Sequence, residues 1–389
     1  MAQMNDPFKS IGVVGLGVMG FDIAFLYAMK GFRTLAYDAA KPARDALADR
    51  REQTVERLSK RNRISDVESR HVRDRLIPAD GLDALIRADL ITEAISENAG
   101  IKLALYRSLR DAGFDGLLAT NTSSLTRAAL LEPGVIDRQN FALTHFFNPV
   151  LHTQTVEVVV GDMDAANARC ISEFLESLGR QPVITRDISG FVSNGILMIY
   201  AVMALRLLER GARIEQVDQA AKSLKLLPPF ISFDSWKPSI VEDVTRIMRE
   251  LRGDAFLRSS KLLTRLAESN PRFYHGGNPN PKILEMAGAG TQMVSDGDVQ
   301  RALRVSLLIA AVRVAELGES PALVDRIATE GIKLPQPPLR QIDAMGAAAL
   351  LEDLDKTNRL LGDRPLAPPR LLTQMARGKN TFRPISGLA

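Results

Sequence analysis

The chain has 389 residues, of which 46% are apolar and 25% are charged, a composition typical of a globular protein with two or three domains. No apolar run approaches the roughly 20 residues needed to cross a bilayer, and the first ten residues lack the apolar core of a secretory signal, so we expect a cytoplasmic protein without membrane contact. A single cysteine excludes internal disulfides and thiolate metal clusters, and the net charge of +4, without interleaved arginine and aromatic residues, favours an anionic ligand over nucleic acid.

Residues 10–38 are predicted to form a strand, a glycine turn, a helix and a second strand. In GLGVMG the first glycine permits a tight turn, the second lets a pyrophosphate approach the backbone, and the third lets helix and strand pack closely. An ordinary glycine turn is the alternative reading. The predicted contacts to a dinucleotide are Gly15, Gly17, Val18, Met19 and Gly20.

Asp38 stands at the end of the second predicted strand. A carboxylate at this position can bind the ribose hydroxyls of a dinucleotide and repel a 2′-phosphate. The combination of glycine turn and aspartate therefore predicts NAD, rather than NADP, as the cofactor.

Two further short strands are predicted within residues 88–102 and 116–124, and each is followed by polar residues. In an open α/β sheet, ligands collect at the carboxyl ends of the strands. We therefore expect Glu97, Lys102 and Ser123 to lie near the cofactor.

His145 lies in the predicted strand FALTHFFNP, and Glu157 lies between valines in the predicted strand TVEVVV. An isolated histidine among apolar residues is more often a satisfied core residue than a functional group. The glutamate is harder to explain, because a buried carboxylate needs a partner, and His145 is the nearest candidate. A carboxylate that accepts the Nδ1 proton would leave Nε2 free to take a proton from an alcohol.

Two other polar features have plain structural readings. Asn194 opens the long apolar segment 191–211, where a polar residue in the first helical turn would be unremarkable as a cap. The basic run RLSKRNR at 57–63 groups Arg57, Lys60, Arg61 and Arg63 in the long hairpin helix predicted after the second strand, and such a run is usually a solvated face.

The second half of the sequence contains an internal repeat. Residues 204–220 recur as 311–327, and the spacing from Gly211 to Asp218 is kept from Gly318 to Asp325. Further on, residues 280–290 have a counterpart at 368–380. The repeat predicts two helical modules that pack face to face about an approximate twofold axis.

Five motifs occur in one order over residues 1–200: GLGVMG, EAISENAGIK, NTSSL, HFFNPV followed by Glu157, and DISGFVSN. This set resembles the 3-hydroxyacyl-CoA dehydrogenase family. The resemblance implies an α/β Rossmann-type NAD-binding domain at 1–187, followed by two all-α domains of the family's C-terminal type at 188–291 and 292–389. It also implies NAD-dependent oxidation of a 3-hydroxyacyl thioester, or the reverse reaction, in fatty acid β-oxidation, by a monomer or a homodimer. Because Gly15 of the NAD-binding domain comes almost at the start of the sequence, we expect this chain to carry only the dehydrogenase step.

The resemblance also assigns roles to individual residues. His145 would be the general base and Glu157 its orienting partner, while Ser123 and Asn194 would hold the substrate oxygen. The basic run would contact the phosphates of CoA, with Arg61 as the best single position. The cofactor contacts implied in addition to the glycine turn and Asp38 are Glu97, Lys102 and Asn148.

Several positions depart from the family pattern. Residues 224–236 lack two expected glycines, Gln154 replaces an expected lysine, and Gly195 replaces an arginine. The expected end of the first helical domain is replaced by GTQMVSDGD. These changes concern the acyl-binding side, so the first alternative is the same chemistry on a carrier-protein thioester or another unusual 3-hydroxy substrate of specialised biosynthesis.

Two further alternatives differ in chemistry. The 3-hydroxyisobutyrate and 6-phosphogluconate dehydrogenases also show the pattern GLGxMG. Those enzymes resemble one another in using a catalytic lysine on the long helix after the NAD domain. In this chain the corresponding segment, residues 191–210, contains no lysine. A non-catalytic NAD-binding or structural relative would not need the set of His145, Glu157, Ser123 and Asn194.

Overall fold

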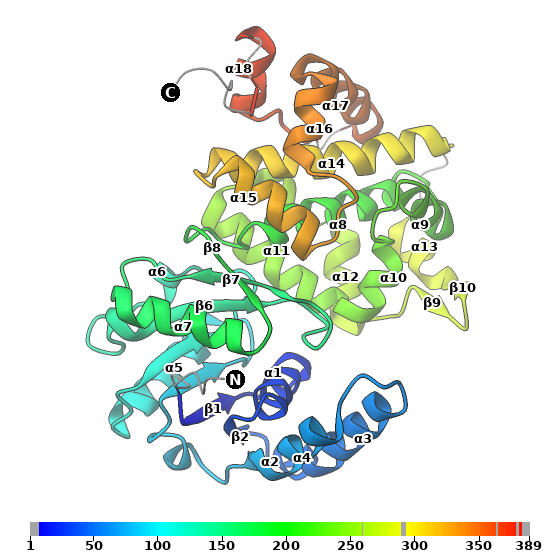
Figure 1. Cartoon of the computed structure of the whole chain (residues 1–389). Helices are drawn as coiled ribbons and strands as arrows, with labels where there is room; N and C mark the ends of the chain where they lie inside the picture. Colours follow the sequence, from blue (N-terminus) through cyan, green and yellow to red (C-terminus); the bar gives the residue numbers. More distant parts are fainter. Residues whose placement is uncertain (1–7, 259, 289–292, 363–364, 379–380, 383–389) are drawn as a thin grey trace. The chain divides into compact units, whose positions relative to one another are not determined.

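The computed structural model describes residues 8–258, 260–288, 293–362, 365–378 and 381–382. The chain divides into two compact units, residues 1–187 and residues 188–389 (Figure 1). The boundary predicted between 291 and 292 lies outside the described residues, so the division of the second unit into two domains stays a prediction.

An eight-stranded sheet forms the centre of the first unit, with the order β3-β2-β1-β4-β5-β6-β7-β8. All neighbouring strands are parallel except β6 and β7, which are antiparallel. The first six strands have the order of the doubly wound dinucleotide-binding fold, so the predicted Rossmann-type architecture is confirmed. The strands are β1 (Ser10–Val14), β2 (Arg33–Tyr37), β3 (Leu76–Pro78), β4 (Leu90–Glu93), β5 (Leu117–Thr120), β6 (Phe141–Phe146), β7 (Thr155–Val159) and β8 (Gln181–Ile184).

Helices connect these strands and cover the sheet. Helix α1 is buried along most of its length, and the Tyr27 ring meets Phe146 of β6 and Phe174 of α7 edge to face. The helices are α1 (Val18–Met29), α2 (Lys41–Asp45), α3 (Leu47–Ser59), α4 (Asp66–Arg75), α5 (Ala99–Asp111), α6 (Arg127–Leu130) and α7 (Ala165–Ser177), with the short 3₁₀ turns η1 (Leu82–Ala84) and η2 (Arg138–Asn140). This packing fixes β6, the strand of His145, against the core.

The basic run at 57–63 lies at the end of α3, where α3 and α4 form the predicted hairpin (Figure 1). Arg57 is in the helix, but Arg61 and Arg63 follow it in an exposed turn. The helix stops because Asn62 adopts a left-handed backbone with φ 51°, a conformation that asparagine tolerates. The prediction of a helical position for Arg61 is therefore wrong.

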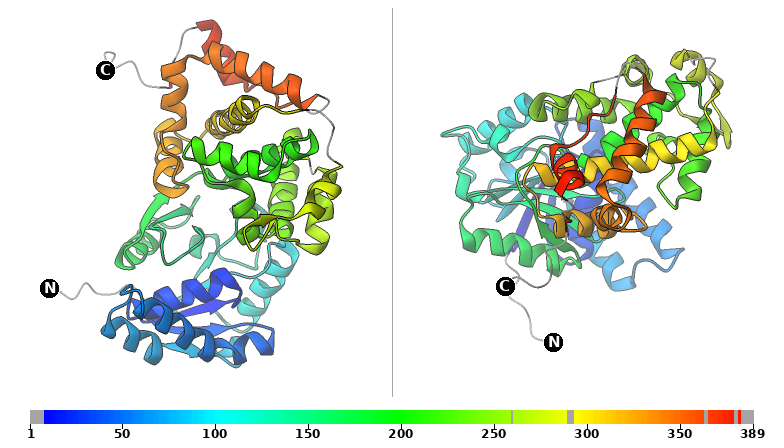
Figure 2. Two further views of the ribbon diagram at one scale, coloured as in Figure 1. Left: turned by 90° about the vertical axis from the view of Figure 1, so that its right-hand side faces the viewer. Right: turned by 90° about the horizontal axis from the view of Figure 1, so that it is seen from above.

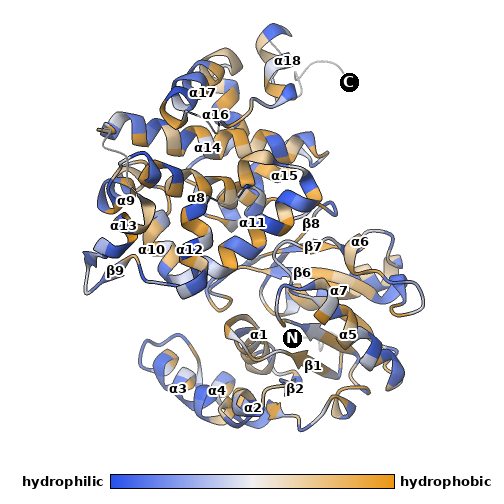
Figure 3. Cartoon of the chain, turned by 180° about the vertical axis from the view of Figure 1, so that it is seen from behind, coloured by the Kyte–Doolittle hydropathy of each residue, from blue (hydrophilic) through white to orange (hydrophobic). Residues whose placement is uncertain are grey.

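The second unit is helical. Its longest helices, α8 and α14, lie side by side, and both carry apolar residues along their length (Figures 2 and 3). Among the described residues, none of the helices combines the length and the apolar character needed to span a membrane. The elements are α8 (Ser193–Glu209), α9 (Ile214–Ser223), α10 (Pro229–Trp236), α11 (Pro238–Arg252), η3 (Ala255–Leu257), α12 (Lys261–Ser269), β9 (Tyr274–His275), β10 (Asn278–Pro279), α13 (Pro281–Ala287), α14 (Asp296–Glu316), α15 (Pro321–Arg326), the π-helical η4 (Ile327–Gly331), α16 (Pro338–Met345), α17 (Ala347–Leu361) and α18 (Arg370–Gly378).

The internal repeat is visible in the backbone of this unit. The series α8 to α11 and the series α14 to α17 both run from a long helix through a proline-started short helix to another long helix. Helix α14 contacts α8 and α9, and η4 contacts α8 in return, as expected for an approximate twofold relation. Left-handed angles recur at matching turns: Gly211 (φ 108°) and Gly318 (95°), Lys225 (57°) and Lys333 (61°), Lys237 (66°) and Gly346 (87°), Gly253 (69°) and Gly362 (71°).

An aspartate performs the same structural task in each copy. Asp218 of α9 accepts hydrogen bonds from the backbone N–H groups of Phe230 (2.9 Å) and Ile231 (3.2 Å) at the start of α10, and Asp325 accepts one from Leu339 (2.7 Å) at the start of α16. Each carboxylate thus satisfies donors that the first turn of a helix leaves without partners. Burial raises the pKa of both carboxyl groups.

Asp218→Ala is expected to lower the free energy of unfolding by about 2–4 kcal/mol, because buried backbone donors and the Tyr274 hydroxyl lose their acceptor. Denaturant unfolding of the whole chain, followed by circular dichroism, measures the change. The control is Asp355→Ala, which removes an exposed carboxylate of α17 and should cost less than about 0.5 kcal/mol. Equal stability of the two variants would contradict the capping role.

Candidate active site

The glycine turn between β1 and α1 leaves room for a phosphate group. Gly15 has φ 95°, and a Cβ there would approach the Ala94 carbonyl oxygen to 2.7 Å. At Gly20 a Cβ would overlap the Gly15 carbonyl oxygen, so only glycine lets α1 pack this closely. A Cβ at Gly17 would meet no atom within 4 Å, which leaves this face of the turn open beside the 61% exposed Val18. The turn therefore fits the pyrophosphate of a dinucleotide.

Asp38 follows β2 and is fixed beside this turn. Its Oδ2 accepts a hydrogen bond from the Leu16 N–H (2.7 Å), and its Oδ1 accepts one from the Ala40 N–H (2.8 Å). The Arg44 guanidinium donates to the Asp38 carbonyl oxygen (2.5 Å) and lies 5.5 Å from the centre of the Tyr37 ring. The carboxylate thus stands next to the glycine turn, where a ribose would follow the pyrophosphate.

His145 and Glu157 face each other across β6 and β7. They are direct partners in the antiparallel register, so their side chains project from the same face of the sheet. His145 Nδ1 lies 2.8 Å from Glu157 Oε2, and the side chains are 7% and 0% exposed. The predicted contact is confirmed. Because a carboxylate only accepts, Nδ1 carries the proton of the neutral ring and Nε2 carries the lone pair.

The carboxyl end of β6 is anchored to that of β5. Asn121 follows β5, and its Oδ1 accepts a hydrogen bond from the Phe146 N–H (3.0 Å). The Phe147 ring lies 5.4 Å from the imidazole of His145. Sequence reasoning did not single out Asn121, although it is the first residue of the NTSSL motif. Its amide places that motif beside the strand of His145.

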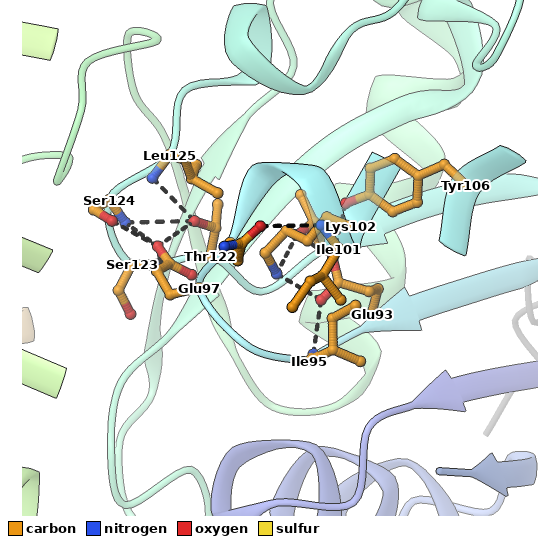
Figure 4. A network of polar contacts seen from close by, with 12 residues as sticks. Glu93, Ile95, Glu97, Ile101, Lys102, Tyr106, Thr122, Ser123, Ser124 and Leu125 are labelled. Carbon is orange, nitrogen blue, oxygen red and sulfur yellow. Dashed lines mark hydrogen bonds and ion pairs between the residues drawn. The ribbon is translucent and has the colours of Figure 1, made fainter. Parts of the chain in front are cut away.

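Glu97 organises the turn that carries Ser123 (Figure 4). Its Oε1 accepts hydrogen bonds from the Thr122 hydroxyl (2.6 Å) and the Ser123 N–H (2.9 Å). The same oxygen accepts from the N–H and the hydroxyl of Ser124, both at 2.7 Å. The structure therefore brings Glu97 and Ser123 together, as expected from their positions at neighbouring strand ends.

Lys102 lies in the first turn of α5 and has no exposed surface. Its Nζ lies 2.6 Å from Oε1 of Glu93, which ends β4 and is also fully buried. The contact between Lys102 and the cofactor stays a prediction, and the structure gives this ammonium a protein partner. Sequence reasoning missed Glu93. The signal was available, because a carboxylate in the apolar strand LITE needs a partner just as Glu157 does.

The remaining predicted site residues stand at separate points. Asn148 is exposed two residues beyond β6, and Arg61 is exposed in the turn between α3 and α4. Asn194 is half-buried in the first turn of α8, in the second unit. Met19 is half-buried in the first turn of α1.

Comparison with known proteins finds two family models that match this chain. The family model "3-hydroxyacyl-CoA dehydrogenase, NAD binding domain" matches residues 10–188, and the model "3-hydroxyacyl-CoA dehydrogenase, C-terminal domain" matches residues 190–273. A probable 3-hydroxybutyryl-CoA dehydrogenase of Deinococcus radiodurans is 31% identical over 268 residues, which cover 66% of this chain and 94% of that protein. The 3-hydroxybutyryl-CoA dehydrogenase of Mycobacterium tuberculosis is 34% identical over 228 residues, which cover 56% and 77%.

A solved structure shares the fold over nearly the whole chain. The crystal structure of 3-hydroxybutyryl-CoA dehydrogenase from Escherichia coli K12 superimposes with a TM-score of 0.77 at 22% identity, covering 95% of this chain and 98% of that one. Fold, family models and relatives agree. The chain belongs to the 3-hydroxyacyl-CoA dehydrogenase family, whose members are NAD-dependent oxidoreductases.

Proposed function

We propose that this protein oxidises the C3 hydroxyl of a 3-hydroxyacyl-CoA to the 3-oxo group with NAD, or catalyses the reverse reduction. The observation that carries the proposal is the buried pair of His145 and Glu157 at the carboxyl end of the sheet. The names of the relatives support a CoA thioester and make 3-hydroxybutyryl-CoA the first substrate to test.

The pair supplies the proton transfer that this reaction needs. As hydride leaves C3, the hydroxyl proton passes to Nε2 of His145, and the electron pair of the broken O–H bond forms the second C–O bond. Bound NAD supplies the hydride acceptor. The imidazolium that forms on His145 is stabilised by the Glu157 carboxylate at Nδ1. In the reverse direction His145 returns the proton to the alcohol.

The other predicted residues would orient the reactants. We assign Ser123 and Asn194 to the oxygens of the substrate, because a hydroxyl and an amide can both donate to a developing carbonyl. Asn148, Glu97 and Lys102 would lie along the cofactor. Arg61, exposed with other basic residues in the turn after α3, would meet the phosphates of CoA.

A panel of 3-hydroxyacyl and 3-oxoacyl thioesters tests the proposal. Each acyl group is offered on CoA and on a carrier protein, with NAD(H), and the formation or loss of NADH is followed. We expect turnover of the CoA thioesters. Turnover restricted to the carrier-protein arm would overturn the assignment of CoA, and no turnover in either arm would overturn the proposed reaction.

The cofactor preference is a separate prediction. The Asp38 carboxylate should hold the ribose and repel a 2′-phosphate, so kcat/KM with NAD should exceed that with NADP by at least about tenfold, or roughly 1.4 kcal/mol. Asp38→Asn keeps an oxygen for the Leu16 N–H and removes the charge. The ratio of kcat/KM with NAD to kcat/KM with NADP should therefore fall. Equal turnover of wild-type protein with both cofactors would refute this role of Asp38.

A further inference from the structure

Arg50, in the first turn of α3, reaches the glycine turn between β1 and α1. Its Nη1 donates a hydrogen bond to the Leu16 carbonyl oxygen (2.5 Å), and its Nη2 donates to the Gly17 carbonyl oxygen (3.3 Å). The guanidinium also lies over the Phe21 ring of α1, with Cζ 4.1 Å from the ring centre. These three contacts fix the Arg50 side chain beside the turn.

The backbone of Leu16 is held from two sides. Asp38 accepts a hydrogen bond from the Leu16 N–H (2.7 Å), and Arg50 donates to the Leu16 carbonyl oxygen. Leu16 stands between the first two glycines of the turn, and a Cβ at Gly17 would meet no atom within 4 Å. Arg50 therefore anchors the same stretch of backbone that is open to the pyrophosphate of a dinucleotide.

The positive charge of Arg50 lies at this turn without a carboxylate directly against it. Its hydrogen bonds go to carbonyl oxygens, and within the residues that the structure describes Arg50 forms no ion pair. Burial lowers the pKa of the guanidinium, while the nearby Asp22 and Asp38 raise it. A half-buried guanidinium that is held by carbonyl groups keeps its full charge, so an anion placed beside it would be attracted.

We propose that Arg50 is a further cofactor-binding residue, whose charge attracts the phosphates of NAD while its hydrogen bonds hold the turn that receives them. A guanidinium suits this role because it stays charged and can donate several hydrogen bonds at once. The inference rests on the proposed function only in that the cofactor is NAD.

Three substitutions separate the charge of Arg50 from its hydrogen bonds. Arg50→Met removes both, Arg50→Gln keeps a donor without charge, and Arg50→Lys keeps the charge. Fluorescence titration of the whole chain gives the Kd of NADH at low and at high salt, and thermal unfolding is followed in parallel. We expect the Kd at low salt to rise at least about tenfold in Arg50→Met and Arg50→Gln, and to stay within about threefold in Arg50→Lys.

The salt dependence is a readout that a purely structural contact would not change. Salt screens the attraction between Arg50 and the phosphates, so the Kd of wild-type protein should rise with salt. In Arg50→Met the Kd should depend less on salt, because the screened charge is gone. With saturating NAD, kcat should stay within about twofold of wild type, because Arg50 affects binding of the cofactor and not the proton transfer.

Two results would overturn the inference. An NADH Kd within about twofold of wild type in Arg50→Gln would show that the charge is not used. The same result in Arg50→Met would make Arg50 a structural link between α3 and the turn. If Arg50→Met fails to fold, the comparison of Arg50→Lys with Arg50→Gln decides.

The next residue of the same helix provides a matched control. Arg51 also donates to a backbone carbonyl, that of Arg73 (3.1 Å), but its Nε pairs with Glu52 (3.0 Å). Arg51→Met should leave the NADH Kd within about twofold of wild type, and an equal loss of NADH binding in both variants would mean a general loosening of α3 and would refute the role of Arg50. The titrations need no thioester turnover, so failure of the proposed reaction is distinguishable from failure of this inference.

Discussion

His145→Gln is expected to lower kcat by about 10²–10⁴, because the alcohol proton loses its acceptor while hydride leaves C3. The glutamine side chain fills a similar volume beside Glu157 and Phe147, so the fold and the NAD site should be kept. Steady-state assays with 3-hydroxybutyryl-CoA measure the rate, and NADH titration measures cofactor binding, which should change by less than about twofold.

A second histidine of the same unit provides the control. His71 is half-buried on α4, outside the proposed site, and His71→Gln should leave kcat within about twofold of wild type. If His145→Gln also kept its rate, the imidazole would be an ordinary core side chain, and the proposed base would have to be withdrawn.

Glu157→Gln has the second largest expected effect, a fall in kcat of about 10²–10³. The amide cannot stabilise the imidazolium that forms on His145. Its NH₂ group can also donate to Nδ1, which would place the ring proton on Nε2 and remove the base. Because Glu157 is fully buried between β6 and β8, the measurement pairs kcat with thermal unfolding to separate rate from stability.

The exposed Glu176 of α7 provides a matched change from carboxylate to amide. Glu176→Gln should leave both the rate and the unfolding temperature nearly unchanged. A Glu157→Gln protein that unfolds earlier but turns over at the wild-type rate would make Glu157 a structural partner of His145 and nothing more.

The contact between His145 and Glu157 could be predicted because it depends on local rules. Each residue is a polar side chain in an apolar strand, and a buried carboxylate needs a partner. The glycine turn and Asp38 were predictable for the same reason, since their chemistry lies in one continuous segment from β1 to β2. The internal repeat was readable because a spacing, from Gly211 to Asp218, recurs in the chain.

Other features could not be predicted, because they depend on tertiary contacts or on backbone angles that the residue type does not indicate. The partner of Lys102 could not be predicted, because Glu93 belongs to another element and meets Lys102 only in the folded sheet. Lys225 and Lys333 adopt left-handed angles where glycine would be the usual signal. The end of α3 before Arg61 similarly depends on the left-handed Asn62.

The most direct test of the account follows the hydride itself. Enzyme in excess is mixed with NAD and 3-hydroxybutyryl-CoA that carries deuterium at C3, and the products of a single turnover are analysed by mass spectrometry. The account predicts one deuterium in NADH for each 3-oxobutyryl-CoA formed, and a rate of formation lower by about 10²–10⁴ in His145→Gln. NADH without deuterium, or an equal rate in the variant, would contradict it.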